Sequence, residues 1–289
     1  MFIPTFNMSM ITIQNLQHTP LPTIVAAFQS AFADYAVAFN DQEIYAILER
    51  RGFDSSYSFA AFKDNQIVGF TLNGIGQMGG KLSAYDTGTG VVIGHRGKGL
   101  ASKIFQHSLP FLKEKGIEQY VLEVLTDNAP AISVYRNLGF EINRNFNCFR
   151  NDKPEPIPHA SNCIITTCAI ENVFPCAVYQ DIEPSWQNNF DALERAGEQL
   201  VCLVAEEQHK TVGYCVFDPT TGDLSNIAVA PHFRRQGIGS RLLNEFYLRK
   251  QTEGVKCLNI DDRDTTLSAF LQKNGFKLIC QQYEMLRKI

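Results

Sequence analysis

The sequence predicts a mixed α/β fold built twice in tandem, and three observations carry this prediction. The length of 289 residues accommodates two ordinary domains. A proline-rich stretch at 151–160 interrupts the chain near its middle, and its three alternating prolines favour an extended connector over a helix. Short motifs recur in the same order on both sides of that stretch. We therefore expect one domain over 9–150, a linker over 151–161 and a second domain over 162–289.

The clearest repeated motif is a glycine loop. The segment 96–101 reads R-x-x-G-x-A, and the segment 234–239, which begins 138 residues later, reads R-x-x-G-x-G. A Gly-Phe pair also recurs, because Gly139 is matched by Gly275, 136 residues further on. The spacing between matched motifs drifts by only a few residues, which indicates that loops changed length while the order of the elements stayed the same.

The pattern of apolar residues predicts alternating strands and helices in each half. In the first half, Ile24, Phe28, Ala31, Phe32 and Tyr35 recur at the spacing of one helix face. The turn pair Asp64-Asn65 predicts a hairpin between two strands. Asn128 is well placed to cap a late helix that ends at Gly139. The expected strands are 11–13, 58–62, 67–72, 84–93, 120–124 and closing strands within 140–149, and the second half is expected to repeat this order.

The composition restricts which partners and which cellular compartment we expect for the protein. The net charge of −4 argues against a broad surface for nucleic acid, which usually needs a basic face. No apolar run reaches the roughly 18 residues of a membrane helix, and residues 1–15 lack the pattern of a secretory signal, so we expect a cytoplasmic protein without membrane or nucleic-acid partners. The eight cysteines form no C-x-x-C pair, which favours reduced thiols over disulfides or a zinc site.

The two glycine loops are typical of anion binding. Each lies between an apolar strand and an amphipathic helix, where unpaired backbone N–H groups and the helix dipole attract negative charge. Glycine lets a phosphate approach the backbone closely, and the neighbouring Arg or Lys adds a direct charge. A single such loop is more often a plain strand-to-helix turn, but two in the same context favour a pyrophosphate site. The run G-x-G-x-x-G at 74–79 is a weaker motif, because no helix pattern follows it as a dinucleotide site requires.

The order of strand, R-x-x-G-x-G/A loop, helix, strand, Asn-capped helix with Tyr, and Gly-Phe resembles the acetyl-CoA-binding core of GNAT N-acetyltransferases in both halves. The resemblance implies a GNAT-like acyl-CoA N-acyltransferase fold in two copies, acetyl-CoA as cosubstrate, and no metal. It also implies that loop amides hold the CoA pyrophosphate while the strand before the loop pairs with the pantetheine arm. The implied cofactor-binding residues are Val91, Arg96, Gly97, Lys98, Gly99, Leu100, Ala101 and Asn128 in the first half, and Val229, Arg234, Arg235, Gln236, Gly237, Ile238 and Gly239 in the second.

The same resemblance implies a catalytic pair in the first half. Family members often use a Tyr on the late helix to protonate the departing CoA thiolate, and Tyr135 lies four residues before Gly139. Glu123 precedes Asn128 by five residues, a spacing similar to that of ribosomal-protein alanine N-acetyltransferases, in which the Glu is the base and the Asn contacts CoA. The second half has Leu271 where the Tyr would stand, and Asn259 where the Glu would stand.

Each candidate also has a structural interpretation. Tyr135 can be a packing residue whose hydroxyl bonds a neighbour, and Glu123 can point to solvent. Asp86, on the strand that leads to the first loop, can face the substrate cleft or serve as a turn acceptor. The second half can bind CoA without turnover, use another acid, or form a wall of the first half's cleft.

These residues predict an acetyl-CoA-dependent N-acetyltransferase that acetylates a primary amine of a small molecule, with the first half as the better candidate for catalysis. The alternatives are a protein that binds or senses acyl-CoA without catalysis, and activity in the second half. The sequence does not identify the acceptor amine or the oligomeric state.

Overall fold

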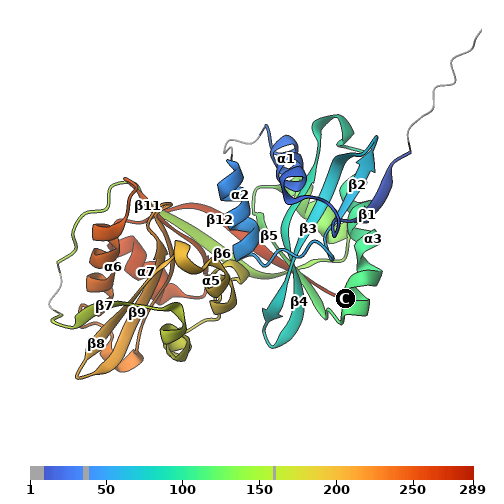
Figure 1. The fold of residues 1–289 in the computed structure, drawn as a ribbon. Helices are drawn as coiled ribbons and strands as arrows, with labels where there is room; N and C mark the ends of the chain where they lie inside the picture. The colour runs from blue at the N-terminus through green and yellow to red at the C-terminus, as the bar shows by residue number, and fades with distance from the viewer. Residues whose placement is uncertain (1–9, 35–38, 159–160) are drawn as a thin grey trace, which may run out of the picture. The chain divides into compact units, whose positions relative to one another are not determined.

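The computed structural model describes residues 10–34, 39–158 and 161–289. Tyr35, the expected domain start at residue 9 and residues 159–160 of the expected linker lie outside this part. The chain divides into two compact units (Figure 1). Unit 1 comprises residues 1–122, 134–140 and 286–289, and unit 2 comprises residues 123–133 and 141–285.

Unit 1 carries the elements expected for the first half. In order they are β1 (Thr12–Asn15), α1 (Leu21–Ala31), α2 (Asp41–Arg50), β2 (Phe59–Lys63), β3 (Gln66–Met78), β4 (Lys81–Val91), a 3₁₀ turn η1 (Ile93–His95), α3 (Leu100–Lys115), β5 (Gln119–Leu125) and α4 (Ala129–Asn137), the last two being shared with unit 2. The strands of unit 1 are arranged in the order β1-β2-β3-β4-β5. All neighbours are antiparallel except β4 and β5, which are parallel.

Unit 2 repeats the strand order, but 3₁₀ segments and one short helix take the place of its first two helices. Its elements are β6 (Glu141–Asn151), β7 (Ile164–Cys168), η2 (Ile170–Tyr179), η3 (Trp186–Asn188), α5 (Phe190–Ala196), η4 (Gly197–Gln199), β8 (Val201–Glu207), β9 (Lys210–Asp218), β10 (Asp223–Val229), η5 (Pro231–Phe233), α6 (Ile238–Arg249), β11 (Val255–Asp261), α7 (Thr265–Lys273) and most of β12 (Lys277–Lys288). The strand order within unit 2 is β12-β6-β11-β10-β9-β8-β7. The predicted mixed α/β fold in two copies is confirmed.

Several local predictions are also confirmed. Asp64 and Asn65 both have positive φ, as a tight hairpin turn requires, and they join Lys63 to its partner Gln66. The Asn128 side chain accepts from the backbone N–H of Ala131 and so caps α4. The G-x-G-x-x-G run lies at the end of β3 and turns directly into β4 without a helix.

The end of the first half differs from the expectation. The segment 140–149 forms one strand, β6, which pairs antiparallel with β11 of the second half in unit 2 (Figure 1). Conversely, residues 286–289 at the end of the second half belong to unit 1, where the Ile289 N–H donates to the Glu118 carbonyl at 3.0 Å. Each compact unit therefore contains chain from both sequence halves. Alternation of apolar residues predicts a strand, but it does not identify the strand's partner.

The alternation of side chains along the strands also explains why helices cover both faces of the sheet in unit 1. Ala60 packs with the apolar face of α1 and α2, whereas its neighbours Phe59 and Ala61 pack with Leu100 and Ile104 of α3. Successive side chains of a strand point to opposite faces, so each face receives its own helical cover. In unit 2, Leu203 and Cys215 pack with α6, and Cys202 and Tyr214 pack with η2 and α5.

Candidate functional site

In both units the strands before and after the glycine loop separate. In unit 1 the last paired residues of β4 and β5 are Tyr85 and Val121. In unit 2 the parallel pairing of β10 with β11 is confined to Asp223 and Lys256. Strands that stop pairing leave backbone N–H and C=O groups available for a ligand. The separation therefore opens a slot between two strands in each unit.

A β-bulge marks the same position in both slots. The register of β3 with β4 shifts so that Thr87 is the extra residue, and the register of β9 with β10 shifts so that Ser225 is the extra residue. Ser225 follows Thr87 by 138 residues, the spacing that also relates the two glycine loops. A bulge bends the strand and re-aims its groups, and bulges often occur beside active sites.

The glycine loops have matching backbone conformations. Gly97 and Gly99 have φ of 75° and 69°, and Arg235 and Gly237 have φ of 65° and 85°. Gly99 and Gly237 immediately precede α3 and α6, and neither helix has a side-chain cap at its N-terminus. Backbone N–H groups at these helix starts are therefore left for an anion. A Cβ at Gly97 or Gly99 meets no protein atom within 4 Å, so the space over the first loop is open.

The arginine that begins each loop pins the loop in place. Arg96 Nε donates to the Val91 carbonyl at 3.0 Å, and its two terminal nitrogens donate to Asp34 at 2.7 and 2.8 Å. Its Nη2 also donates to the Ala31 carbonyl at the end of α1. The hydrogen bonds from Arg96 hold the pKa of Asp34 below its usual value.

Arg234 repeats these contacts in unit 2. Its Nε donates to the Val229 carbonyl at 2.9 Å, and its terminal nitrogens donate to Asp181 and to the Tyr179 carbonyl. Asp34 and Asp181 were not found from the sequence, because no motif surrounds them and each lies far from its arginine along the chain. Each guanidinium already meets a carboxylate and two carbonyls.

The remaining loop side chains also contact the protein. Lys98 Nζ donates to the Gly94 carbonyl at 3.2 Å, and Gln236 Nε2 donates to the His232 carbonyl at 3.3 Å. Leu100 and Ile238 are buried and anchor the helices to their cores. Ala101 and Gly239 lie in the first turn of these helices, where a Cβ at Gly239 would come within 3.4 Å of the Phe270 ring.

Unit 2 contains a cavity of about 1080 Å³ over its glycine loop. Its lining includes the predicted residues Val229, Arg234, Arg235, Gly237, Ile238 and Gly239. It also includes β11 and the face of α7 that carries Leu267 and Phe270. This volume is at or above the upper end of the 300–1,000 Å³ common for small-molecule sites. Leu271, which replaces the expected phenol, is fully buried, so α7 offers no hydroxyl at that position.

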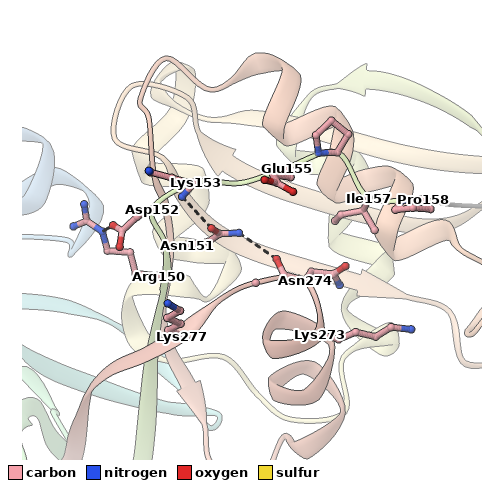
Figure 2. Close-up of a pocket in the computed structure, with 12 residues that line it drawn as sticks. Arg150, Asn151, Asp152, Lys153, Glu155, Ile157, Pro158, Lys273, Asn274 and Lys277 are labelled. Atoms are coloured by element: carbon pink, nitrogen blue, oxygen red, sulfur yellow. Dashed lines mark hydrogen bonds and ion pairs between the residues drawn. The ribbon is translucent and has the colours of Figure 1, made fainter.

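A second cavity of unit 2, about 640 Å³, lies beside the linker (Figure 2). Asn151 at the linker's start donates to the Asn274 carbonyl at 3.1 Å and accepts from the Lys153 N–H. Further along, Ile157 exchanges two hydrogen bonds with the Asn244 side chain of α6. The described linker residues are therefore fastened to unit 2.

Tyr135 and Asp86 meet in unit 1. The Tyr135 hydroxyl donates to Asp86 Oδ2 at 3.3 Å, and the Tyr135 ring packs edge-on against Phe140. Asp86 also accepts from the Gly88 N–H and from the Thr89 hydroxyl. Asp86 keeps some exposure to solvent but is surrounded by protein atoms, and this desolvation raises its pKa to about 6, against the opposing hydrogen bonds.

Glu123 lies in unit 2 with other partners. Its Oε2 accepts from Asn259 Nδ2 at 2.6 Å and from Gln187 Nε2. Asn128, also in unit 2, uses its side-chain oxygen to cap α4. The catalytic role of Glu123 and the cofactor contact of Asn128 stay predictions. Among the described residues, no group of three or more His, Cys, Asp or Glu side chains is arranged to hold a metal ion.

The two family models that match this chain are both acetyltransferase models. The Acetyltransferase (GNAT) family model matches residues 24–140, and the Acetyltransferase (GNAT) domain model matches residues 198–278. The chain belongs to the GNAT acetyltransferase family. It is a tandem member with one such domain in each half.

Curated relatives match part of the chain. Streptothricin acetyltransferase of Streptomyces lavendulae is 36% identical over 87 residues, which cover 30% of this chain and 45% of that protein. N-alpha-acetyltransferase 30 of Schizosaccharomyces pombe is 34% identical over 29% of this chain and 57% of its own length. Mycothiol acetyltransferase of Saccharomonospora viridis is 36% identical over 31% of each chain. The chain thus matches about half the length, or less, of these relatives.

Solved structures of the same fold cover nearly the whole chain. A tandem GNAT protein from the clavulanic acid biosynthesis pathway superposes with a TM-score of 0.72 at 12% identity, over 96% of this chain and 98% of its own. A GCN5-related N-acetyltransferase from Sphaerobacter thermophilus gives a TM-score of 0.69 at 13% identity, over 96% and 95%. At these identities the likeness shows the fold alone. Among the described residues, no helix combines the length and apolar composition needed to cross a bilayer.

Proposed function

We propose that the chain transfers the acetyl group of acetyl-CoA to a primary amine of a small molecule, and that unit 1 carries the chemistry. The observation that supports this most is the contact of Tyr135 with Asp86 beside the slot between β4 and β5. Acyl transfer from a thioester to an amine is helped by a side chain that can protonate the departing thiolate, and the contact with Asp86 orients the Tyr135 hydroxyl. Members of the family use acetyl-CoA in general and act on small-molecule or protein amines.

In this proposal each loop binds the CoA pyrophosphate through backbone N–H groups. The arginines Arg96 and Arg234 hold the loops in the binding conformation, because their guanidinium groups are engaged by Asp34 and Asp181. The exposed strand edges near Val91 and Val229 receive the pantetheine arm. A neutral amine then attacks the thioester carbonyl, and Tyr135 protonates the thiolate that leaves. No covalent enzyme intermediate is needed.

A small-molecule acceptor is favoured by two points. The net charge of −4 suits a cationic amine better than a polyanion. Two of the relatives are named for streptothricin and mycothiol, whereas the third is named for N-alpha acetylation. An acceptor panel should therefore contain small amines and amino sugars, with short peptides carrying a free N-terminus as the competing class.

The cavity of unit 2 supports a second candidate function, acyl-CoA binding without turnover in the second half. The predicted loop residues line it, but α7 presents Leu271 in place of a phenol. If the second half only binds acyl-CoA, the protein senses acyl-CoA or holds a second cofactor molecule. Catalysis by the second half is a separate alternative.

The test is CoA thiol release from acetyl-CoA with the amine panel, together with calorimetric titration of CoA. We expect turnover with at least one small amine, and a rise in melting temperature with acetyl-CoA. At a hundredfold excess over Kd, a ligand bound only by the folded state stabilises it by about 2.7 kcal/mol. Binding heat without thiol release supports the non-catalytic alternative. If CoA gave no binding heat and acetyl-CoA gave no thermal shift, both candidate functions would be contradicted.

A further inference from the structure

We propose that Asp86 and Tyr135 form a proton relay in which the proton of the attacking amine, once taken by Asp86, releases the Tyr135 hydroxyl to protonate the departing thiolate. This inference rests on the proposed function and goes beyond it, because it assigns the proton acceptor and the order of the two proton transfers.

The position of Asp86 fits a proton acceptor. It directly follows Tyr85, the last residue of β4 that pairs with β5, and it directly precedes the bulged Thr87. Its side chain therefore lies where the slot between the strands begins. The residue as a whole keeps partial exposure to solvent.

Three hydrogen bonds fix the carboxylate in one orientation. Oδ1 accepts from the Gly88 N–H at 3.0 Å, and Oδ2 accepts from Thr89 Oγ1 at 2.9 Å and from Tyr135 at 3.3 Å. The bond to Tyr135 is the longest of the three and joins β4 to α4. Thr89 Oγ1 also lies 3.1 Å from Oδ1, so Oδ2 is the oxygen that faces the phenol, and it carries both the shortest and the longest of these bonds.

Among the charged and titratable groups of this region, Asp86 is the one that can accept the proton of the amine. Arg51, at the end of α2, donates to the Thr87 carbonyl at 2.9 Å and favours the ionised carboxylate from a distance. Tyr120 of β5 gives its hydroxyl proton to Asn73 and has its pKa raised well above the usual value by burial. Tyr85 is buried beside them. Desolvation outweighs the opposing hydrogen bonds and Arg51, so the carboxylate of Asp86 takes up a proton near pH 6 instead of near pH 4.

The direction of the Tyr135 bond depends on the protonation of Asp86. An ionised carboxylate only accepts, so the phenol proton points at Oδ2 and away from any other acceptor. A carboxylic acid donates, so a protonated Asp86 turns its proton to the phenol oxygen. The phenol proton is then free for the thiolate. The acid becomes available only after the amine has delivered its proton.

The proton balance closes without solvent. The amine nitrogen bonds to the acetyl carbon, and its excess proton moves to Asp86 Oδ2. The carbon–sulfur bond breaks, and the thiolate takes the Tyr135 proton. Asp86 then returns its proton to the Tyr135 oxygen. The products are the amide and CoA thiol, and both side chains regain their starting states.

The test compares Asp86→Asn, Tyr135→Phe and the double variant in steady-state turnover over pH 5 to 9. Asp86→Asn keeps the acceptor for Gly88 but cannot take a proton. Asp64→Asn, in the exposed turn between β2 and β3, is the matched control and should turn over like the wild type. Glu123→Gln is assayed beside them, since Glu123 is the base that the sequence predicts.

We expect each relay variant to lose about 10²–10⁴-fold in kcat, as is usual for a general acid or base. The double variant should lose no more than the worse single variant, because groups that act as a unit are not additive. The part of the acid-side fall of wild-type kcat/KM that titrates with Asp86, at a pKa of about 6, should be absent from Asp86→Asn, whereas the part set by protonation of the amine substrate should remain. Formate should partly restore Asp86→Ala.

Other outcomes separate the relay from the function. A wild type that turns over while Asp86→Asn keeps full kcat overturns the relay and leaves the N-acetyltransferase. Losses that multiply in the double variant show two independent groups and also overturn it. A large loss confined to Glu123→Gln transfers the base to Glu123. A wild type without turnover on any amine overturns the proposed function, and the relay with it.

Discussion

Asn259 donates a hydrogen bond to Glu123 at 2.6 Å, although the two residues stand at matching positions of the two sequence halves. Gln187 of η3 donates to the same carboxylate oxygen, and Gln282 donates to the Asn259 oxygen at 3.0 Å. The position that the resemblance assigns to a base is therefore held by two amides within unit 2. Its carboxylate has a structural task whatever its part in catalysis.

Glu123→Gln should lower the free energy of unfolding by about 1–3 kcal/mol, because hydrogen bonds to a charged acceptor contribute more than bonds to a neutral one. The amide oxygen of the variant can still accept from Asn259 and Gln187, but it carries no charge, and an amide N–H₂ takes the place of the other carboxylate oxygen. Urea unfolding of the whole chain measures the change. Glu118→Gln, an exposed neighbour, is the control and should stay within about 0.5 kcal/mol of the wild type. Equal stability of the two variants would show that the amides do not need the carboxylate.

Gly99→Glu should abolish turnover, whereas Gly237→Glu should leave much of it. At Gly99 the change adds strain at a φ of 69° and places a carboxylate over the proposed pyrophosphate site. Gly116→Glu is the control, because Gly116 ends the same helix at a φ of 86° with equally open space. Thiol release is the readout. If only Gly237→Glu were inactive, with all variants folded, the active site would belong to unit 2.

Arg96→Lys should weaken acetyl-CoA binding by about tenfold, or about 1.4 kcal/mol, because an ammonium cannot replace the guanidinium contacts to Asp34, Val91 and Ala31. Asp34→Asn removes the charge of the partner and should weaken binding in the same direction. Calorimetry on both variants distinguishes the two interpretations. A direct contact of Arg96 with phosphate would make Asp34→Asn bind as tightly as the wild type, or more tightly.

Tyr135→Phe should lower kcat by about 10²–10⁴-fold with little change in acetyl-CoA affinity. The hydroxyl is needed when the thiolate departs, whereas the ring that packs against Phe140 is kept. Steady-state kinetics with calorimetric affinity separates the two effects. A change confined to KM would make the phenol a binding residue, and a kcat within twofold of the wild type would make it structural.

Asp86 should make the protein less stable as pH rises from about 4 to about 6. Its folded pKa of about 6 exceeds the value of 3.8 expected in the unfolded chain, so in this window the folded state binds more protons. Stability carried by the protonated form is complete below the unfolded value and is lost as pH passes the folded one. Asp86→Asn should thus be more stable than the wild type at pH 7.5 by at most about 3 kcal/mol, since one pKa unit corresponds to about 1.4 kcal/mol.

Melting temperatures at pH 4 and pH 7.5 measure this difference. The advantage of Asp86→Asn should be present at pH 7.5 and much smaller at pH 4, where the wild-type carboxyl is protonated in the folded state and partly protonated in the unfolded one. An advantage of the same size at both pH values would assign it to packing instead of charge.

The sequence predicted the features that depend on neighbours in the chain. The Asn128 cap and the Asp64-Asn65 turn both follow from a few adjacent residues. The partners that form over long distances were not predicted. Asp34 and Asp181 reach their arginines across 62 and 53 residues, and no local pattern specifies such a pair.

The dependence on local patterns also explains which residues of the candidate site could be predicted. Tyr135 was found because it stands at a fixed distance from a Gly-Phe pair, and Asp86 was left between two interpretations because its partner lies 49 residues away. The pairing of β6 with β11 of the second half was not predicted, for a different reason. The apolar pattern of a strand shows which of its faces is buried, but it does not show which strand lies beside it. β6 can bury the same face beside β11 or beside another strand.

The bond between Ile289 and Glu118 places a constraint on how the protein is made. Domains generally fold as units, beginning at the N-terminus while the ribosome is still adding residues. Unit 1 includes residues 286–289, so it cannot be completed during synthesis of the first half and must wait until the last of these residues has emerged. Until then β5 is an open edge, whose unpaired backbone groups can pair with other chains.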